Sequence, residues 1–133
     1  MSRNSRRRRA AFIVLRASLT ILYAYSGADL ILHPSGWYWA VGALPDFFGV
    51  FVNDIGIDSY LRGQGVFELL LAMAFAAWFL PGRAVRAAAA ISAVQMALIL
   101  LLVGVRVDTF RDIAILGNAL AVFLLAKSSS YAK

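Results

Sequence analysis

The sequence predicts an all-α membrane protein built as a bundle of four transmembrane helices. Hydrophobic residues make up 62% of the 133-residue chain, whereas soluble domains contain about 45–50%. The mean hydropathy is +0.76. The apolar residues are gathered into four stretches, and each approaches the length of about 20 residues that crosses a bilayer as a helix. One domain of this size has room for about four such spans.

The predicted spans and the segments that join them follow in chain order. Residues 1–9 form a basic tail before the first span, and residues 127–133 form a second tail after the last. An outer segment over residues 33–62 separates the first two spans and is too long for a simple loop in a compact protein. The transmembrane domain covers residues 10–126, with spans at 10–32, 63–80, 84–105 and 110–126.

The outer segment contains the signals of a helix that lies on the membrane surface. Pro45 and Asp46 suit the first turn of a helix, where proline needs no amide donor and an acid meets the positive end of the helix dipole. Phe47 and Phe51 then share one face. The pattern predicts a short amphipathic helix that lies at the outer interface as a lid.

Aromatic residues precede this helix. Trp37 and Trp39 are of the type that sits at the level of the lipid headgroups. A ligand-binding aromatic box is the alternative interpretation, and an aromatic belt seated in the interface is favoured.

The distribution of charge predicts the orientation. The chain has 13 Lys and Arg, seven Asp and Glu and a net charge of +6. Most of the cations flank the predicted spans on one side, which favours a cytoplasmic location for both termini. Because the cations accompany apolar spans, they give no reason to expect nucleic acid as a partner. The cations on the predicted inner side are Arg3, Arg6, Arg7, Arg8, Arg9, Arg83, Arg86, Lys127 and Lys133.

Two intramembrane charges, Arg16 and Glu68, are candidates for a buried site. Arg16 shares a helical face with Tyr23 and Gly27, so it either pairs inside the bundle or extends to the headgroups. Glu68 lies early in the second span. Arg111 opens the fourth span at a similar depth, which predicts an ion pair that either fixes the helices or forms part of a ligand site.

Further polar residues complete the candidate set. Gln95 and Asn118 fall at similar depth near the middle of spans three and four, which predicts a hydrogen bond between them. Asp29 and His33 lie one turn apart at the outer end of the first span. They are interpreted as an interfacial pair, with a proton relay or half of a metal site as alternatives. Asp112 follows Arg111 at the outer mouth of the bundle.

Over about residues 16–126, the sequence resembles the DoxX-like family of small four-helix bacterial membrane proteins. The resemblance implies a four-helix bundle in a bacterial cytoplasmic (inner) membrane, and some relatives are subunits of a thiosulfate:quinone oxidoreductase. The residues that carry it are Arg16, Gly27, Leu44 with Pro45, Gly63, Gly65 and Glu68 before LLLA, and Arg111 with Asp112 before IAILGNALAVFLL.

Three functions follow as hypotheses. The first is a non-catalytic accessory or scaffold subunit of a larger membrane assembly that includes other membrane-protein subunits. The second is a quinone-linked oxidoreductase subunit that binds a small ligand at the outer mouth, with a quinone as its only candidate cofactor. A small transporter ranks last, since no inverted repeat is visible. No catalytic or metal residues are predicted: the chain has no cysteine and one His, too few ligands for a haem or an iron–sulfur cluster.

Overall fold

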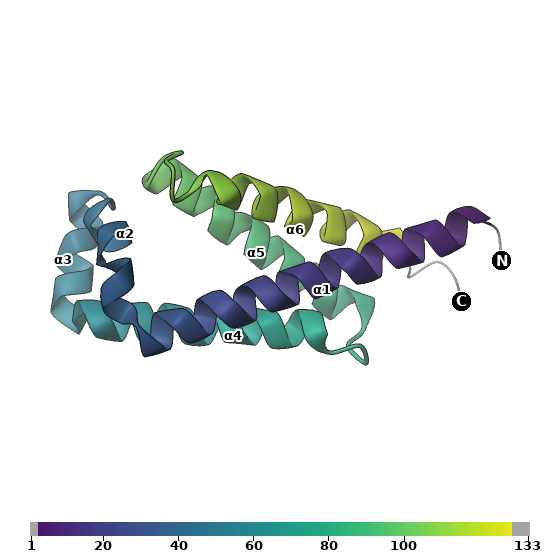
Figure 1. Cartoon of the computed structure of the whole chain (residues 1–133), viewed down its shortest axis with the longest axis horizontal. Coiled ribbons are helices and arrows are strands. Elements are labelled where there is room, and N and C mark those ends of the chain that lie inside the picture. The colour runs from purple at the N-terminus through teal and green to yellow at the C-terminus, as the bar shows by residue number, and fades with distance from the viewer. Residues whose placement is uncertain (1–2, 129–133) are drawn as a thin grey trace.

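The computed structural model describes residues 3–128, and every regular element within that range is helical (Figure 1). The predicted all-α class is therefore confirmed. The elements are α1 (Arg3–Leu32), the 3₁₀ turn η1 (Pro34–Trp37), α2 (Tyr38–Gly42), α3 (Asp46–Ile55), α4 (Ile57–Ala76), α5 (Gly82–Leu102) and α6 (Phe110–Ser128).

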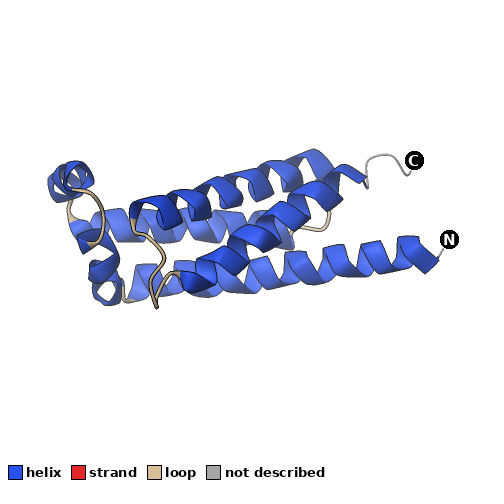
Figure 2. Ribbon diagram, turned by 90° about the horizontal axis from the view of Figure 1, so that it is seen from above, coloured by secondary structure: helices blue, strands red, loops and turns tan. Residues whose placement is uncertain are grey.

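The four long helices form two pairs. Helix α1 packs along α4 and α5 packs along α6, while α1 also touches α6 and α4 makes much smaller contact with α5. The pairs lie close together at one end and diverge toward the other, where η1, α2 and α3 are found (Figure 1). The start of α1 and the end of α6 share the closed end (Figure 2). Because the number of long helices is even, the start of α1 and the end of α6 lie on the same side.

Two of the long helices, α1 and α5, are long and apolar enough to cross a membrane. Helices α4 and α6 have 20 and 19 residues, which is a comparable length, but neither meets the same combined criterion of hydropathy and few charged residues. Asp58, Arg62 and Glu68 lie in α4, and Arg111, Asp112 and Lys127 lie in α6. The structure thus gives two candidate spans by length and composition.

The observed helix boundaries differ from the predicted ones mainly at the second span. Helix α4 begins at Ile57, six residues before the predicted start. Gly56, with a φ of 84°, makes the turn that precedes the helix. Gly63 and Gly65, where the start was expected, lie within the helix and do not interrupt it. The helix ends at Ala76, and Ala77 is extended. Pro81 then precedes α5. The predicted end at residue 80 is therefore wrong.

The two predicted tails also differ from expectation. Residues 3–9 continue α1 as a helix whose arginines are exposed, and these first turns project beyond the other helices (Figure 1). Helix α6 extends to Ser128. The remainder of the predicted tails, residues 1–2 and 129–133, lies outside the described residues.

The contact between α1 and α4 is centred on two glycines. A Cβ atom at Gly27 would lie 2.7 Å from the carbonyl oxygen of Gly65, and one at Gly65 would lie 2.7 Å from the carbonyl oxygen of Gly27. Such distances leave no room for a side chain, so the two backbones touch directly. The sequence predicted the polar face of α1 correctly, since Arg16, Tyr23 and Gly27 are all buried.

A polar link lies within the core that joins the two pairs. Tyr23 and Phe75 are fully buried and stack with ring centroids 6.2 Å apart. The Tyr23 hydroxyl is hydrogen-bonded to Ser92 on α5, where either atom can donate. The alanine-rich start of α5 packs as predicted, with Ala88 and Ala89 buried beside it.

Candidate functional site

A cavity of about 800 Å³ lies between the two helix pairs. Its wall is mainly apolar, and a few polar side chains face it from α1, α4, α5 and α6. Cavities of this size and character are typical of sites for small organic ligands. The lining includes Leu22, Tyr23, Ser26, Leu30, Trp37, Trp39, Val41, Leu44, Phe48, Tyr60, Gln64, Glu68, Gln95, Met96, Ile99, Arg111, Asp112 and Ile115.

Glu68 is the most deeply buried acid of this cavity, with 5% of its surface exposed. Its Oε1 atom accepts hydrogen bonds from the Nε2 atoms of Gln64, one turn earlier, and Gln95 on α5, at 3.4 and 3.3 Å. Ser26 on α1 is a further hydrogen-bond partner of this side chain. The carboxyl group is therefore held by neutral side chains from three helices.

The predicted ion pair between Glu68 and Arg111 is wrong. Among the side chains that the structure describes, residues 3–126, the one salt bridge joins His33 to Asp29. Arg111 is exposed and lies over the ring of Trp37, with its Cζ atom 5.9 Å from the ring centroid. The prediction placed both residues about one turn inside an outer helix end, whereas Glu68 lies about three turns into α4 and Arg111 is near the first residue of α6. Both residues line the cavity that lies where the pair was expected.

The predicted hydrogen bond between Gln95 and Asn118 is also wrong. Gln95 turns toward α4 and donates to Glu68. Asn118 turns toward α1, and its Nδ2 atom donates to Ser18 Oγ at 2.6 Å. Each amide faces a different neighbouring helix.

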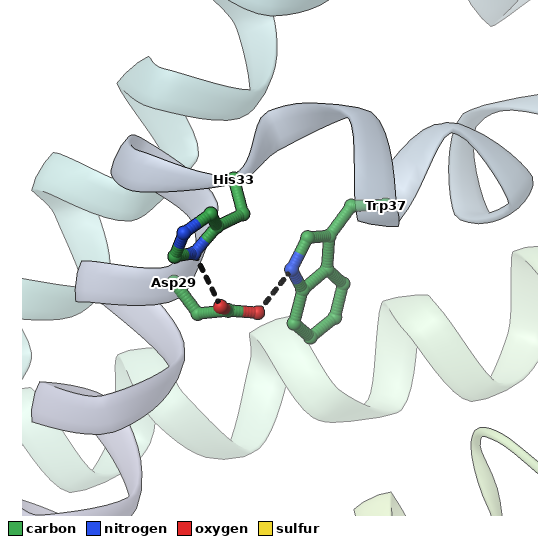
Figure 3. Close-up of polar contacts among 3 residues, drawn as sticks. All are labelled: Asp29, His33 and Trp37. Atoms are coloured by element: carbon green, nitrogen blue, oxygen red, sulfur yellow. Dashed lines mark hydrogen bonds and ion pairs between the residues drawn. The ribbon is translucent and has the colours of Figure 1, made fainter.

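Asp29 joins two side chains at the outer end of α1. Its Oδ1 atom lies 3.1 Å from Nδ1 of His33, and its Oδ2 atom accepts a hydrogen bond of 2.8 Å from the indole nitrogen of Trp37 (Figure 3). The predicted proximity of Asp29 and His33 is confirmed. The partner that the sequence did not reveal is Trp37, whose ring the carboxylate orients.

Trp37 and Arg111 form a wall shared by two cavities. Both residues line the large cavity and also a second one of about 570 Å³, which Asp29 and His33 border as well. Trp39 lines both cavities too and stacks against Trp37 with ring centroids 6.4 Å apart. The aromatic residues assigned to an interfacial belt therefore also form part of a cavity wall.

The predicted amphipathic helix is present as α3, with its outward face uncovered. Phe47 and Phe51 are 68% and 55% exposed. The neighbouring Phe48 lines the large cavity instead. The segment from η1 to α3 thus covers the open end of the bundle with one set of aromatic side chains and presents another set outward.

A hydrogen bond fastens this covering segment to α4. The Tyr38 hydroxyl donates to Asp58 Oδ1 at 2.6 Å. This hydrogen bond raises the pKa of the Tyr38 phenol above its ordinary value, because it favours the protonated form.

Arg16 lies at the other end of the bundle and is 4% exposed. Its Nε atom donates to the carbonyl oxygen of Phe75 at 2.9 Å, and its Nη2 atom donates to that of Ala77 at 3.0 Å. The guanidinium also lies 5.6 and 4.8 Å from the ring centroids of Phe12 and Trp78. Of the two alternatives, interior placement is correct. Its partners are the terminal carbonyls of α4 rather than an acid.

Three cavity residues were not singled out from the sequence as site candidates. Ser26 and Gln64 contact Glu68, and Tyr60 lines the same wall. The position of Gln64 one helical turn before Glu68 was a usable signal. Ser26 could not be found in this way, because its role depends on the packing of α1 against α4.

Within the described range, no three His, Cys, Asp or Glu side chains are grouped to hold a metal ion. The chain matches no protein-family model, and neither a curated protein nor a solved structure is significantly similar to it.

Proposed function

We propose that the chain is a DoxX-like, four-span protein of the bacterial cytoplasmic membrane and a non-catalytic subunit of a larger redox assembly. Its own contribution is to hold a quinone-type ligand between its two helix pairs. The observation that carries the proposal is the large apolar cavity with a buried acid and two amides on its wall. A ring with a few polar substituents matches such a wall in size and polarity.

The proposal of four spans rests on the partners of α4 and α6. Each of these helices packs along one of the two apolar helices and has a comparable length. Each also presents large apolar side chains outward, such as Leu70 at 54% and Met73 at 58% on α4 and Leu124 at 68% on α6. In a water-soluble monomer these apolar side chains would be exposed to water, whereas in a membrane lipid tails or partner helices would cover them.

Cysteine labelling tests the topology, and the natural absence of cysteine provides a clean background. Ser35 lies at the open end and Arg83 at the closed end, and both are exposed. In spheroplasts, a membrane-impermeant maleimide is expected to label Ser35→Cys at once and Arg83→Cys only after lysis. The opposite pattern would mean that the orientation is inverted, and labelling of both before lysis would exclude a bundle that separates the two ends.

Ligand-induced stabilisation tests the binding function. A short-chain benzoquinone, added in its oxidised or reduced form to the purified protein in detergent, is expected to raise the midpoint of thermal unfolding. A ligand at 100 times its dissociation constant contributes about 2.7 kcal/mol. Absence of stabilisation by both forms would remove the proposed function.

A matched pair of variants locates the binding. Ile99 lines the cavity, whereas Leu101 on the same helix is 79% exposed and does not. Ile99→Trp is expected to fill part of the cavity and to abolish most of the ligand-induced stabilisation, while Leu101→Trp keeps it. Equal responses of the two variants would place the ligand on the outer surface of the bundle.

A scaffold without a ligand is the second candidate, and the exposed apolar surface of all four long helices supports it. Membrane proteins purified in mild detergent retain tightly bound partners, so co-purification of other subunits together with no response to the quinone would favour this candidate.

A further inference from the structure

Two buried oxygens at the contact between α4 and α5 have no hydrogen-bond partner in the protein. One is Oε2 of Glu68 on α4, and the other is Oε1 of Gln95 on α5. Both atoms have almost no accessible surface, so neither water nor a ligand of the cavity reaches them. Buried polar atoms in native proteins nearly always have a partner, so these two require an explanation within the protein itself.

The side chains of Glu68 and Gln95 already share one hydrogen bond. The Nε2 atom of Gln95 donates to Oε1 of Glu68 at 3.3 Å, so each unpartnered oxygen belongs to one member of this pair. If the carboxyl group is ionised, both oxygens are acceptors and neither satisfies the other. If Oε2 carries a proton, it becomes a donor, and the amide oxygen of Gln95 is the matching acceptor. A single proton thus accounts for both atoms and closes the acid and the amide into a pair with two hydrogen bonds.

No cation pairs with Glu68. Among the side chains described, residues 3–126, the one salt bridge joins Asp29 and His33. Arg111, the partner expected from the sequence, lies over the ring of Trp37. A carboxylate that is 5% exposed and has no counter-charge is costly, and the acid avoids this cost by keeping its proton.

The other groups around Glu68 add no positive charge from any of the packed helices. Gln64 on α4 donates an amide hydrogen to Oε1, and Ser26 on α1 contacts the carboxyl group with a hydroxyl, which either donates or accepts. Tyr23 on α1 and Asp112 on α6 are the titratable groups near enough to interact electrostatically with Glu68. One is a phenol and the other a second acid, so neither stabilises an ionised Glu68 as a counter-charge would.

We infer that Glu68 is a proton-binding site, which holds a proton on Oε2 at neutral pH and donates it to Oε1 of Gln95. This acid–amide pair joins α4 to α5, two helices that otherwise make much less contact than the helices within each pair. The bound proton is therefore part of the link between the two helix pairs. Its loss would leave both oxygens unsatisfied and weaken this link. The inference concerns the bundle itself and holds whether or not the cavity takes a quinone.

Infrared spectroscopy of the purified protein, in a detergent without ester groups, tests the inference. A protonated carboxyl group has a carbonyl band separate from those of carboxylates and amides, and exposed acids are ionised at neutral pH. The wild type is expected to show this band and Glu68→Gln to lose it. Asp112→Asn is the matched control, with the neighbouring acid replaced, and it should keep the band. Absence of the band from the wild type, or an unchanged band in Glu68→Gln, would overturn the inference.

A second variant tests the partner of the proton. Gln95→Leu removes both the amide that donates to Oε1 and the oxygen that accepts from Oε2. The carbonyl band of Glu68 is therefore expected to shift to higher frequency, as it does when a carboxyl group loses its hydrogen bonds. An unshifted band would exclude the pair with Gln95. This comparison also decides the question if Glu68→Gln does not fold.

Discussion

Replacing Gly27 with alanine is expected to push α1 away from α4 and to lower the free energy of unfolding by about 1–3 kcal/mol, the usual cost of overpacking. The new Cβ would lie 2.7 Å from the carbonyl oxygen of Gly65 and 3.1 Å from the amide nitrogen of Leu69. Both are backbone atoms, so relief requires a shift of the whole helix. Gly65→Ala should cost a similar amount, since its Cβ would lie 2.7 Å from the carbonyl oxygen of Gly27.

Unfolding in mixed micelles with increasing dodecyl sulfate measures these effects. Gly63→Ala is the matched control, because it lies in the same helix as Gly65 and a Cβ there meets no atom within 4 Å. The control should be at least as stable as the wild type, since alanine favours a helix more than glycine does. The double variant of Gly27 and Gly65 should cost less than the sum of the single changes, because the first change already separates the backbones. If Gly27→Ala is as stable as Gly63→Ala, the close contact does not exist.

Replacing Arg16 with methionine is expected to lower the free energy of unfolding by about 3 kcal/mol. The change leaves the carbonyl oxygens of Phe75 and Ala77 without the donors that they have in the wild type. Each unsatisfied buried group costs about 1–3 kcal/mol, and in the membrane location proposed above no water would replace the donor. Removal of a buried charge offsets part of this cost.

Arg16→Lys separates the contribution of charge from that of hydrogen bonding. An ammonium keeps the charge but lacks the planar fork of donors with which Arg16 contacts two carbonyl groups. Its stability is expected to lie between that of the wild type and that of Arg16→Met in the same detergent titration. A fully stable Arg16→Met would show that the end of α4 finds other donors.

Positions along each helix were largely predictable, whereas the direction of a side chain around the helix axis was not. The burial of Arg16, Tyr23 and Gly27 followed from their spacing, because helical periodicity places them on one face. The partners predicted for Glu68 and Gln95 were wrong, because the position of a residue along its helix does not tell which of the other helices its side chain faces.

The end of the second span illustrates a second limit. Pro81 is an evident stop signal in the sequence, and it misplaced the end of the helix by four residues. The actual break at Ala77 accompanies the hydrogen bonds that Arg16 of another helix makes to the carbonyls of Phe75 and Ala77. Because Arg16 is so distant in sequence from the end of α4, the residues around Ala77 carry no local sequence signal for this helix end. The cavity was unpredictable for a related reason, since it depends on the angle between two helix pairs.

The acceptors of Arg16 also impose an order on the assembly of the chain during synthesis. The carbonyls that receive its hydrogen bonds lie 59 and 61 residues further along the chain. A ribosome that makes about 5–20 residues each second needs several seconds to cover that distance. During that time the guanidinium of Arg16 has no end of α4 to contact, and in the membrane location proposed above it would extend to the phosphate groups of the lipids. The contact between Arg16 and the end of α4 therefore forms only after α4 has been made.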